Sequence, residues 1–314
     1  MNAKKKIYLV TGGAGFIGSH LVDRLIALGH RVGVVDNLST GKKEHINAKA
    51  LFYHADIRDK KSMAKWFRGV DGIFHLAALA RIQPSFAKPQ DYVDTNALGT
   101  KHILELAKKY KVKRVVYSAS SSAYGHQTKL LREDLALLPQ ALSPYSSTKR
   151  MGEMLMRDMG SMTGGPETVC LRYFNVYGPR QTTTADGPYA TVVGIFLDQW
   201  KREEPFSIVP FPGKLLGAQR RSFTHVDDVA AANLLAMDSP RVGAGEIINI
   251  GTKENASIKE LAFLIGGKNY PCIKAPARKN EVFETRADIQ KAKTLLHWQP
   301  RVSLTQGIEQ LKKY

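Results

Sequence analysis

The run Thr11–Gly18, with the sequence TGGAGFIG, constrains the fold of this chain more than any other stretch. It follows a short apolar segment, residues 7–10, and opens a segment with apolar residues at helical spacing, residues 16–28. Strand, glycine-rich turn and helix together cradle a dinucleotide pyrophosphate, because glycine lets the backbone approach the ligand and the helix start offers free N–H groups. A second apolar segment, residues 31–35, ends at Asp36, where a carboxylate can bind the adenosine ribose. The alternative is a structural turn in which Asp36 caps a helix.

Apolar segments and helical patterns alternate through the first half of the chain. This alternation predicts an α/β fold with a Rossmann-type, doubly wound parallel sheet and a smaller C-terminal α/β substrate-binding lobe. We predict strands at residues 6–10, 31–35, 50–54, 71–75, 113–118, 167–172 and 246–250. We predict helices at residues 16–28, 60–67, 95–110, 144–162, 191–201 and 227–237. The dinucleotide-binding domain should comprise residues 1–176 with 222–251, and the smaller lobe residues 177–221 with 252–314.

Composition limits the partners of the chain. Its 314 residues carry 46 lysines and arginines against 28 acidic residues, a net charge of +18 that favours anionic ligands. The basic residues are spread in short clusters without a nucleic-acid-binding module, so we expect no specific nucleic acid. No apolar run is long enough to cross a membrane, and residues 1–6 lead into a strand without a signal segment. We therefore expect a cytoplasmic protein with Cys170 and Cys272 reduced and, since no histidine pattern suits one, no metal.

Tyr145 and Lys149 lie four residues apart, directly after Pro144, where a helix can begin. On a helix they share one face. A phenol is a poor base at neutral pH because its ordinary pKa is about 10, and a nearby ammonium group favours the phenolate. We therefore predict that Lys149 lowers the pKa of Tyr145, which then accepts a proton from a substrate hydroxyl. The alternative is a solvated lysine beside a half-buried tyrosine.

A predicted strand runs into a serine-rich turn at residues 115–125, VVYSASSSAYG. Ligands of open α/β sheets bind beyond the carboxyl ends of the strands, so a serine here can hydrogen-bond a substrate oxygen. Ordinary turn chemistry is the alternative, because serine is common in loops.

These motifs, in this order, resemble those of the extended short-chain dehydrogenase/reductases, and in particular the NAD-dependent sugar-nucleotide epimerase/dehydratase family. The resemblance spans essentially the whole chain. Its other landmarks are DNLSTG at residues 36–41, DIRD at 56–59, HLAA at 75–78, Asn96, LRYFNVYGPR at 171–180, and Arg221.

The resemblance implies a role for each of these residues. Tyr145, Lys149 and Ser120 would be catalytic, and NAD would be the cofactor. The residues implied in NAD binding are Gly12, Gly15, Phe16, Ile17, Gly18, Asp36, Asn37, Ser39, Asp56, Ile57, Ala77, Ala78, Asn96, Ser118, Tyr145, Lys149 and Tyr173. The residues implied in sugar-nucleotide binding are Ser120, Ser122, Tyr145, Asn175, Arg221, Arg278, Glu281 and Thr285. Asn175, Arg221 and Arg278 would bind the diphosphate, although the segment Arg278–Glu281 departs from the family pattern.

By the same resemblance the expected reaction is 4-epimerisation of a UDP-hexose through a transient 4-keto sugar. The position seven residues after Arg278 controls pocket size in family 4-epimerases. Thr285 stands there, which predicts that UDP-N-acetylglucosamine and UDP-N-acetylgalactosamine fit as well as UDP-glucose and UDP-galactose. A 4,6-dehydratase would need carboxylates in the serine turn, which has none. UDP-uronate decarboxylation or epimerisation, and a non-enzymatic nucleotide- or RNA-binding role, stay open. Helices 95–110 and 144–162 are expected to form a homodimer interface.

Overall fold

The computed structural model describes residues 5–127 and 130–313. The prediction that the chain starts without a signal segment rests partly on residues 1–4, which lie outside the described residues. Seven parallel strands form the central sheet, in the order β11-β6-β5-β4-β1-β2-β3. The strands are β1 (Ile7–Thr11), β2 (Arg31–Asp36), β3 (Leu51–His54), β4 (Gly72–His75), β5 (Arg114–Ser120), β6 (Glu167–Tyr173) and β11 (Ala244–Ile250). The predicted fold class is confirmed, and all seven strands lie within two residues of the predicted ranges.

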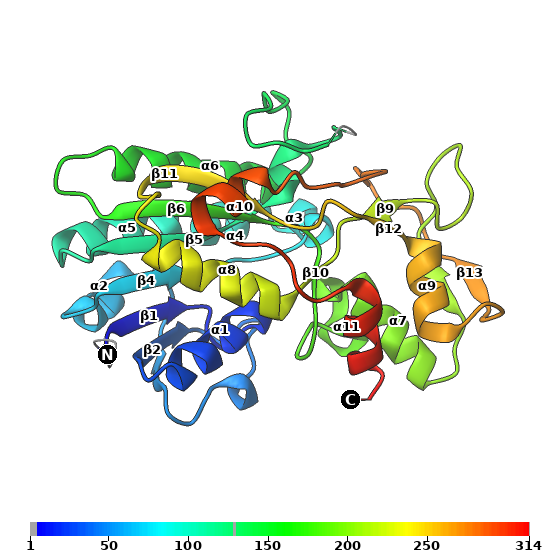
Figure 1. Cartoon of the computed structure of the whole chain (residues 1–314), viewed down its shortest axis with the longest axis horizontal. Helices are drawn as coiled ribbons and strands as arrows, with labels where there is room; N and C mark the ends of the chain where they lie inside the picture. Colours follow the sequence, from blue (N-terminus) through cyan, green and yellow to red (C-terminus); the bar gives the residue numbers. More distant parts are fainter. Residues whose placement is uncertain (1–4, 128–129, 314) are drawn as a thin grey trace.

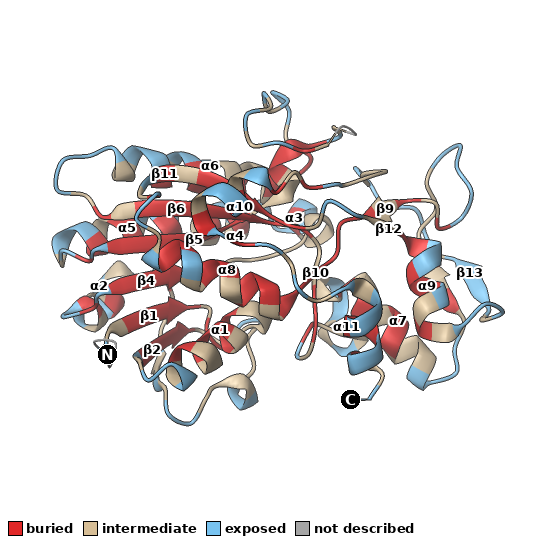
Figure 2. Ribbon diagram, in the orientation of Figure 1, coloured by how far each residue is buried: buried red, intermediate tan, exposed pale blue. Residues whose placement is uncertain are grey.

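Helices cover both faces of the sheet (Figure 1). One face packs against α1 (Phe16–Ala27), α8 (Val226–Asp238) and α10 (Gln290–Leu296). The other face packs against α2 (Lys60–Met63), α5 (Gly99–Lys109) and α6 (Pro144–Gly160). The predicted helix 60–67 divides into α2 and a 3₁₀ turn, η2 (Ala64–Phe67), and the predicted helix 95–110 starts as a π-helical stretch, η3 (Val93–Leu98). Burial is concentrated in the strands and on the inward sides of these helices (Figure 2).

A smaller lobe has its own core of Phe196, Phe206, Leu261 and Ile308. Its helices are α7 (Val192–Lys201), α9 (Ile258–Gly266) and α11 (Leu304–Leu311). Short strands pair as β8 (Phe206–Ile208) with β13 (Cys272–Lys274), β9 (Arg220–Arg221) with β12 (Ala256–Ser257), and β7 (Val176–Tyr177) with β10 (Thr224–His225).

The C-terminal part of the chain contributes both to the core beside the sheet and to the core of the small lobe. Ala292, Leu296 and Trp298 are buried in the large core beside the sheet, whereas Ile308 and Leu311 are buried in the small lobe. The predicted assignment of residues 252–314 to one lobe thus crosses two cores, and the exact domain division stays a prediction. Within the described residues, none of the helices is both long and apolar enough to cross a membrane.

The strand order reverses between β1 and β4, which lie side by side. In open α/β sheets the crevice at such a point, beyond the carboxyl ends of the strands, is where ligands bind. The glycine-rich turn follows β1, Asp36 ends β2, Ser120 ends β5 and Tyr173 ends β6. The fold therefore gathers the predicted site residues at one edge of the sheet.

Candidate active site

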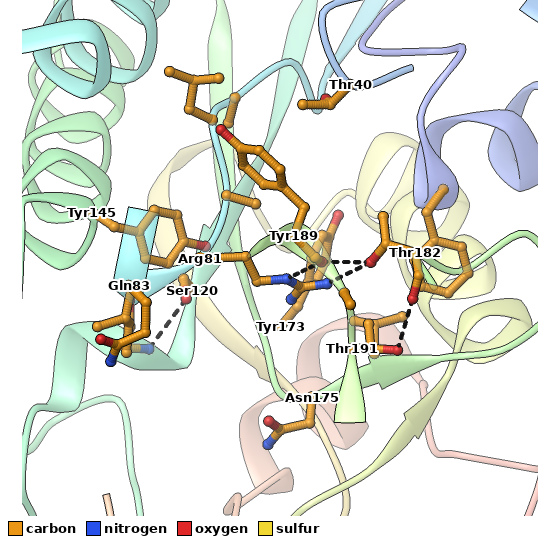
Figure 3. A pocket seen from close by; sticks show the side chains of 18 of the residues that line it. Thr40, Arg81, Gln83, Ser120, Tyr145, Tyr173, Asn175, Thr182, Tyr189 and Thr191 are labelled. Carbon is orange, nitrogen blue, oxygen red and sulfur yellow. Dashed lines mark hydrogen bonds between the residues drawn. The ribbon is translucent and has the colours of Figure 1, made fainter. Parts of the chain in front are cut away.

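A cleft of about 1030 Å³ lies at this edge and continues into the small lobe. With one exception, Asn96, every predicted cofactor, catalytic and substrate residue lines this cleft. Figure 3 shows part of it, with Tyr145 and Ser120 on one side and Thr182 and Thr191 on the other. The predicted residues therefore share one continuous cleft, and the role of each residue in it stays a prediction.

The glycine-rich turn is shaped as a cradle. Gly12 has φ +72°, and a Cβ there would lie 2.6 Å from the backbone nitrogen of Ala77. A Cβ on Gly18 would collide with the carbonyl oxygen of Gly12. Helix α1 starts directly after Gly15, so the N–H groups of its first turn are at the cleft wall. A turn without side chains at a helix N-terminus fits a dinucleotide pyrophosphate.

Asp36 lies beside the cradle at the end of β2. Its carboxylate accepts hydrogen bonds from the backbone nitrogens of Ala14, at 3.0 Å, and Leu38, at 2.8 Å. Burial raises the pKa of Asp36, and these two hydrogen bonds counteract part of the rise. Next to it, the Asn37 side chain donates to Asp56 at 2.9 Å, which links the two loops predicted to hold adenosine. The alternative role for Asp36, capping a helix, is not observed, because the Asp36 contacts stabilise the turn.

Lys149 is buried in the cleft floor. Helix α6 starts at Pro144 with Ser143 as its N-cap, whose hydroxyl accepts a hydrogen bond from Ser146 N at 3.2 Å. From this helix the Lys149 ammonium donates to the Ser118 carbonyl at 2.7 Å. Burial lowers the pKa of Lys149 to about 7, and the charge of Glu153 opposes this shift. The solvated lysine of the alternative interpretation is therefore excluded.

Tyr145 corrects one prediction. Burial raises the pKa of its phenol, whereas Ser120 and the Arg81 guanidinium act in the opposite direction. The expected net lowering of the Tyr145 pKa is wrong in this structure, because desolvation of the phenol outweighs its polar neighbours. The Tyr145 ring contacts Tyr92 edge-on, with ring centroids 6.2 Å apart.

The serine turn forms a short 3₁₀ helix, η4 (Ser121–Tyr124), capped by the Ser120 hydroxyl, which accepts from Ser122 N at 3.2 Å. The Ser122 hydroxyl is buried and has no hydrogen-bond partner within the described residues. A buried hydroxyl without a partner is costly, so one on a cleft wall is a candidate ligand contact.

The predicted sugar-nucleotide residues meet where β9 and the segment 278–285 adjoin. Arg221 is buried and pairs with Glu281, with 2.6 Å between Nη2 and Oε1. Burial lowers the pKa of Arg221, and Glu281 opposes the shift. Asn175 donates to Ser222 O at 3.2 Å and to Thr285 Oγ1 at 3.4 Å. Glu281 thus holds Arg221 in place, a contact that sequence reasoning did not anticipate.

The positions of Asn96 and Arg81 relative to the cleft were not predicted from the sequence. Asn96 lies behind the cleft wall, where its side chain bonds Leu79 N at 2.8 Å and Leu79 O at 2.9 Å, so it orders the wall. Arg81 was missed, yet it lines the cleft with φ +82°. Its guanidinium donates to Tyr189 O at 2.9 Å and to Thr182 Oγ1 at 3.2 Å (Figure 3). The available signal was a charged residue soon after the HLAA motif, which begins at the last residue of β4.

Comparison with known proteins agrees with this geometry. Residues 8–251 match the model of the NAD dependent epimerase/dehydratase family. A putative UDP-glucose 4-epimerase from Methanocaldococcus jannaschii is 39% identical over 307 residues, covering 96% of both chains. A UDP-N-acetyl-alpha-D-glucosaminuronate decarboxylase from Bacillus cytotoxicus is 35% identical over 322 residues, covering 98% of this chain and 96% of the relative. The crystal structure of UDP-glucose 4-epimerase with UDP-glucose from Thermotoga maritima superposes with a TM-score of 0.89 at 39% identity, covering 98% of both chains.

Proposed function

Because the chain belongs to the NAD dependent epimerase/dehydratase family, we propose that it is a nucleotide-sugar 4-epimerase that uses UDP-hexoses. The candidate substrates are the pair UDP-glucose and UDP-galactose and the pair UDP-N-acetylglucosamine and UDP-N-acetylgalactosamine. The observation that carries the proposal is that Tyr145, Ser120 and Lys149 lie in the same cleft as the glycine cradle and Asp36. One cleft therefore holds a proton-transfer group beside a dinucleotide site.

The cofactor, NAD, supplies reversible hydride acceptance when it is bound. Gly12, Gly15 and Asp36 would hold its pyrophosphate and adenosine ribose. Tyr145 would accept the proton of the substrate 4-hydroxyl and return it later, so that the sugar passes through a 4-keto form. Ser120 would hydrogen-bond the reacting oxygen, and Lys149 would fix the floor of the site through the Ser118 carbonyl.

The high pKa of the Tyr145 phenol has a consequence for this mechanism. A buried phenol releases its proton only when positive charge or hydrogen-bond donors favour the phenolate. Ser120 and Arg81 already act in that direction. We therefore infer that Tyr145 becomes an effective base only in the loaded cleft, where the catalytic proton transfer is needed.

Binding of the diphosphate is proposed for Asn175, Arg221 and Arg278. Arginine suits this task because its planar guanidinium can bind two phosphate oxygens at once. Arg278 is exposed at the cleft rim, whereas Arg221 is buried and already fixed by Glu281. The pair Arg221–Glu281 thus offers a preorganised cation, and Arg278 a cation that can close on the ligand.

The serine turn distinguishes this proposal from dehydration. Elimination of water needs an added acid and base, and residues 118–124 contain no carboxylate.

UDP-uronate decarboxylation is the second candidate function, because the Bacillus cytotoxicus relative is named a UDP-N-acetyl-alpha-D-glucosaminuronate decarboxylase. The proposed homodimer would use α5 and α6, and on α6 the side chains of Met151 and Met154 are 46% and 65% exposed.

The test is incubation of purified protein with each of the four UDP-sugars and with UDP-glucuronate and UDP-N-acetylglucosaminuronate, followed by chromatography and mass measurement. We expect 4-epimers of at least one neutral sugar pair. Tyr145→Phe should lose conversion by at least about a thousandfold while it keeps bound NAD. Tyr92→Phe is the matched control, since it removes a neighbouring phenol that bonds the Ala80 carbonyl. Loss of carbon dioxide from a uronate would favour the decarboxylase, and RNA binding that collapses with salt, without turnover, would favour the non-enzymatic role.

A further inference from the structure

The segment 182–191 lies between β7 and α7, and Thr182 and residues 187–191 line the cleft. It contains the kinked 3₁₀ stretch η5 (Thr184–Tyr189), in which Gly187 has φ +59° and precedes Pro188. None of residues 182–190 is buried. When a segment buries no apolar side chains, the free energy needed to open it locally is small unless polar contacts stabilise the closed position.

The two ends of the segment are tied together and to the small lobe. Thr182 donates through its hydroxyl to Tyr189 O at 2.6 Å, and Thr191 N donates to Thr182 O at 3.2 Å. The Thr184 hydroxyl donates to Asp198 of α7 at 2.6 Å. The base is therefore fixed, and the crown, residues 185–188, is joined to it through Asp186, which accepts a hydrogen bond from Thr183 N at 2.7 Å.

Polar contacts join this segment to two separate loops of the large body. Asp186 pairs with Lys42 at 3.1 Å. Lys42 belongs to the cradle, because its backbone nitrogen donates to Ala14 O at 3.0 Å. The second contact comes from Arg81, which donates to Tyr189 O and Thr182 from the loop after β4. The segment is thus latched both beside Asp36 and beside Tyr145, the two ends of the predicted cofactor site.

We propose that residues 183–190 form a strap across the mouth of the dinucleotide cleft, and that the latches Lys42–Asp186 and Arg81–Tyr189 slow the release of NAD. The strap closes the cleft when both latches are made. Opening the Lys42 latch separates the crown around Gly187 from the glycine cradle, while the Thr184–Asp198 and Thr183–Asp186 hydrogen bonds keep the base in place. Retention matters for a reaction that returns its cofactor to the starting oxidation state in every turnover.

The latch Lys42–Asp186 is the accessible one to test, because neither side chain has a proposed role in catalysis. An ion pair with side chains 40% and 17% exposed is expected to be weak and sensitive to salt. Lys42→Met and Asp186→Asn should each release bound NAD about two- to fivefold faster than the parent protein. Lys42→Arg should restore the parent rate, and Lys43→Met, the same change at the exposed neighbouring position, should leave it unchanged.

The measurement is displacement of bound NAD by excess etheno-NAD, at low and high ionic strength and without any sugar. Hydrogen exchange of the peptide that covers residues 183–190 gives a second readout, which should rise in both latch variants. Asp186→Asn separates the strap from a direct contact of Lys42 with the cofactor, because it leaves the lysine in place and keeps an amide oxygen that can accept the hydrogen bond from Thr183 N. Parent-like release from Asp186→Asn, or equal acceleration by Lys43→Met, would overturn the strap. Because no sugar is involved, this result is independent of the proposed epimerase activity.

Discussion

Glu153 and Arg172 form a buried, two-pronged ion pair behind the candidate active site. Nε and Nη2 of Arg172 each donate to a different carboxylate oxygen of Glu153, both at 2.7 Å. The side chains are 4% and 2% exposed. Glu153 lies one helical turn beyond Lys149 on α6, and Arg172 comes from β6, so the pair joins the helix that carries Tyr145 to the sheet.

Glu153→Gln should lower the free energy of unfolding by about 3–5 kcal/mol, because it leaves a buried guanidinium without its counter-charge. Urea unfolding measures this loss. Glu105→Gln is the matched control, since Glu105 pairs with Lys60 at the surface and should cost about 1 kcal/mol or less. Equal losses in the two variants would contradict the assignment of Glu153 as a structural anchor of α6.

Lys149 should give the stability of the protein a pH dependence. Burial lowers its pKa to about 7, below its ordinary value of 10.5. Between these two values the unfolded chain binds a proton that the folded protein does not, so the contribution of Lys149 to stability rises with pH and is flat below 7. Lys149→Met removes this dependence.

The difference in unfolding free energy, Lys149→Met minus parent, should therefore fall by up to about 2 kcal/mol from pH 7 to pH 9. Urea unfolding of the NAD-free proteins at several pH values measures it. Lys113→Met, at an exposed position, should show a constant difference over the same range. A Lys149 difference that does not change with pH would mean that its ammonium is not desolvated in the folded protein.

The elements that sequence reasoning found are those with local signals. The glycine-rich turn and the spacing of Tyr145 and Lys149 are contained within single strand–turn–helix or helix segments, so periodicity and turn residues were sufficient. The partner of Lys149 was not predictable, because the Ser118 carbonyl lies 31 residues away and meets it only when α6 packs on β5. Sequence order also could not show that desolvation would dominate the pKa of Tyr145.

Long-range packing explains the remaining differences. The assignment of residues 252–314 to one lobe followed chain order, yet Ala292 and Trp298 are buried beside the sheet. Arg81 has no spacing motif, and its importance comes from contacts with Thr182 and Tyr189, about a hundred residues later in the chain. Such contacts form only when the sheet domain and the small lobe pack on either side of the cleft.

Substitutions at two glycines can distinguish the effect of a steric clash from the effect of an unfavourable backbone conformation. Gly18→Ala would place a methyl group against the Gly12 carbonyl oxygen, so α1 must move away from the turn. We expect loss of NAD binding and a decrease in unfolding free energy of more than about 2 kcal/mol. Gly29→Ala is the control: it has φ +83° and open space for a Cβ, so it should cost about 1 kcal/mol and leave NAD binding intact. Calorimetric titration with NAD and urea unfolding distinguish these outcomes.

Thr285 is the position from which we expect sugar selectivity to be controlled. It lines the cleft, and its hydroxyl accepts hydrogen bonds from Asn175, at 3.4 Å, and from Ser222 N, at 3.3 Å. A tyrosine at this position would add a ring to the part of the wall that adjoins the proposed diphosphate contacts. The volume taken by the ring should exclude an N-acetyl group before it excludes a hydroxyl.

Thr285→Tyr should therefore lower kcat/KM for the two N-acetylated UDP-sugars by about tenfold or more, with a change of less than about threefold for UDP-glucose and UDP-galactose. Thr285→Val is the matched control, because it keeps the volume and removes only the hydroxyl that Asn175 and Ser222 contact. If Thr285→Val reproduces the selectivity change, the hydrogen bonds and not the space determine the preference. If Thr285→Tyr instead lowers kcat/KM equally for all four sugars, the acetyl group must lie elsewhere in the cleft. In that case the ring acts by disturbing Asn175, which would weaken diphosphate binding for every substrate alike.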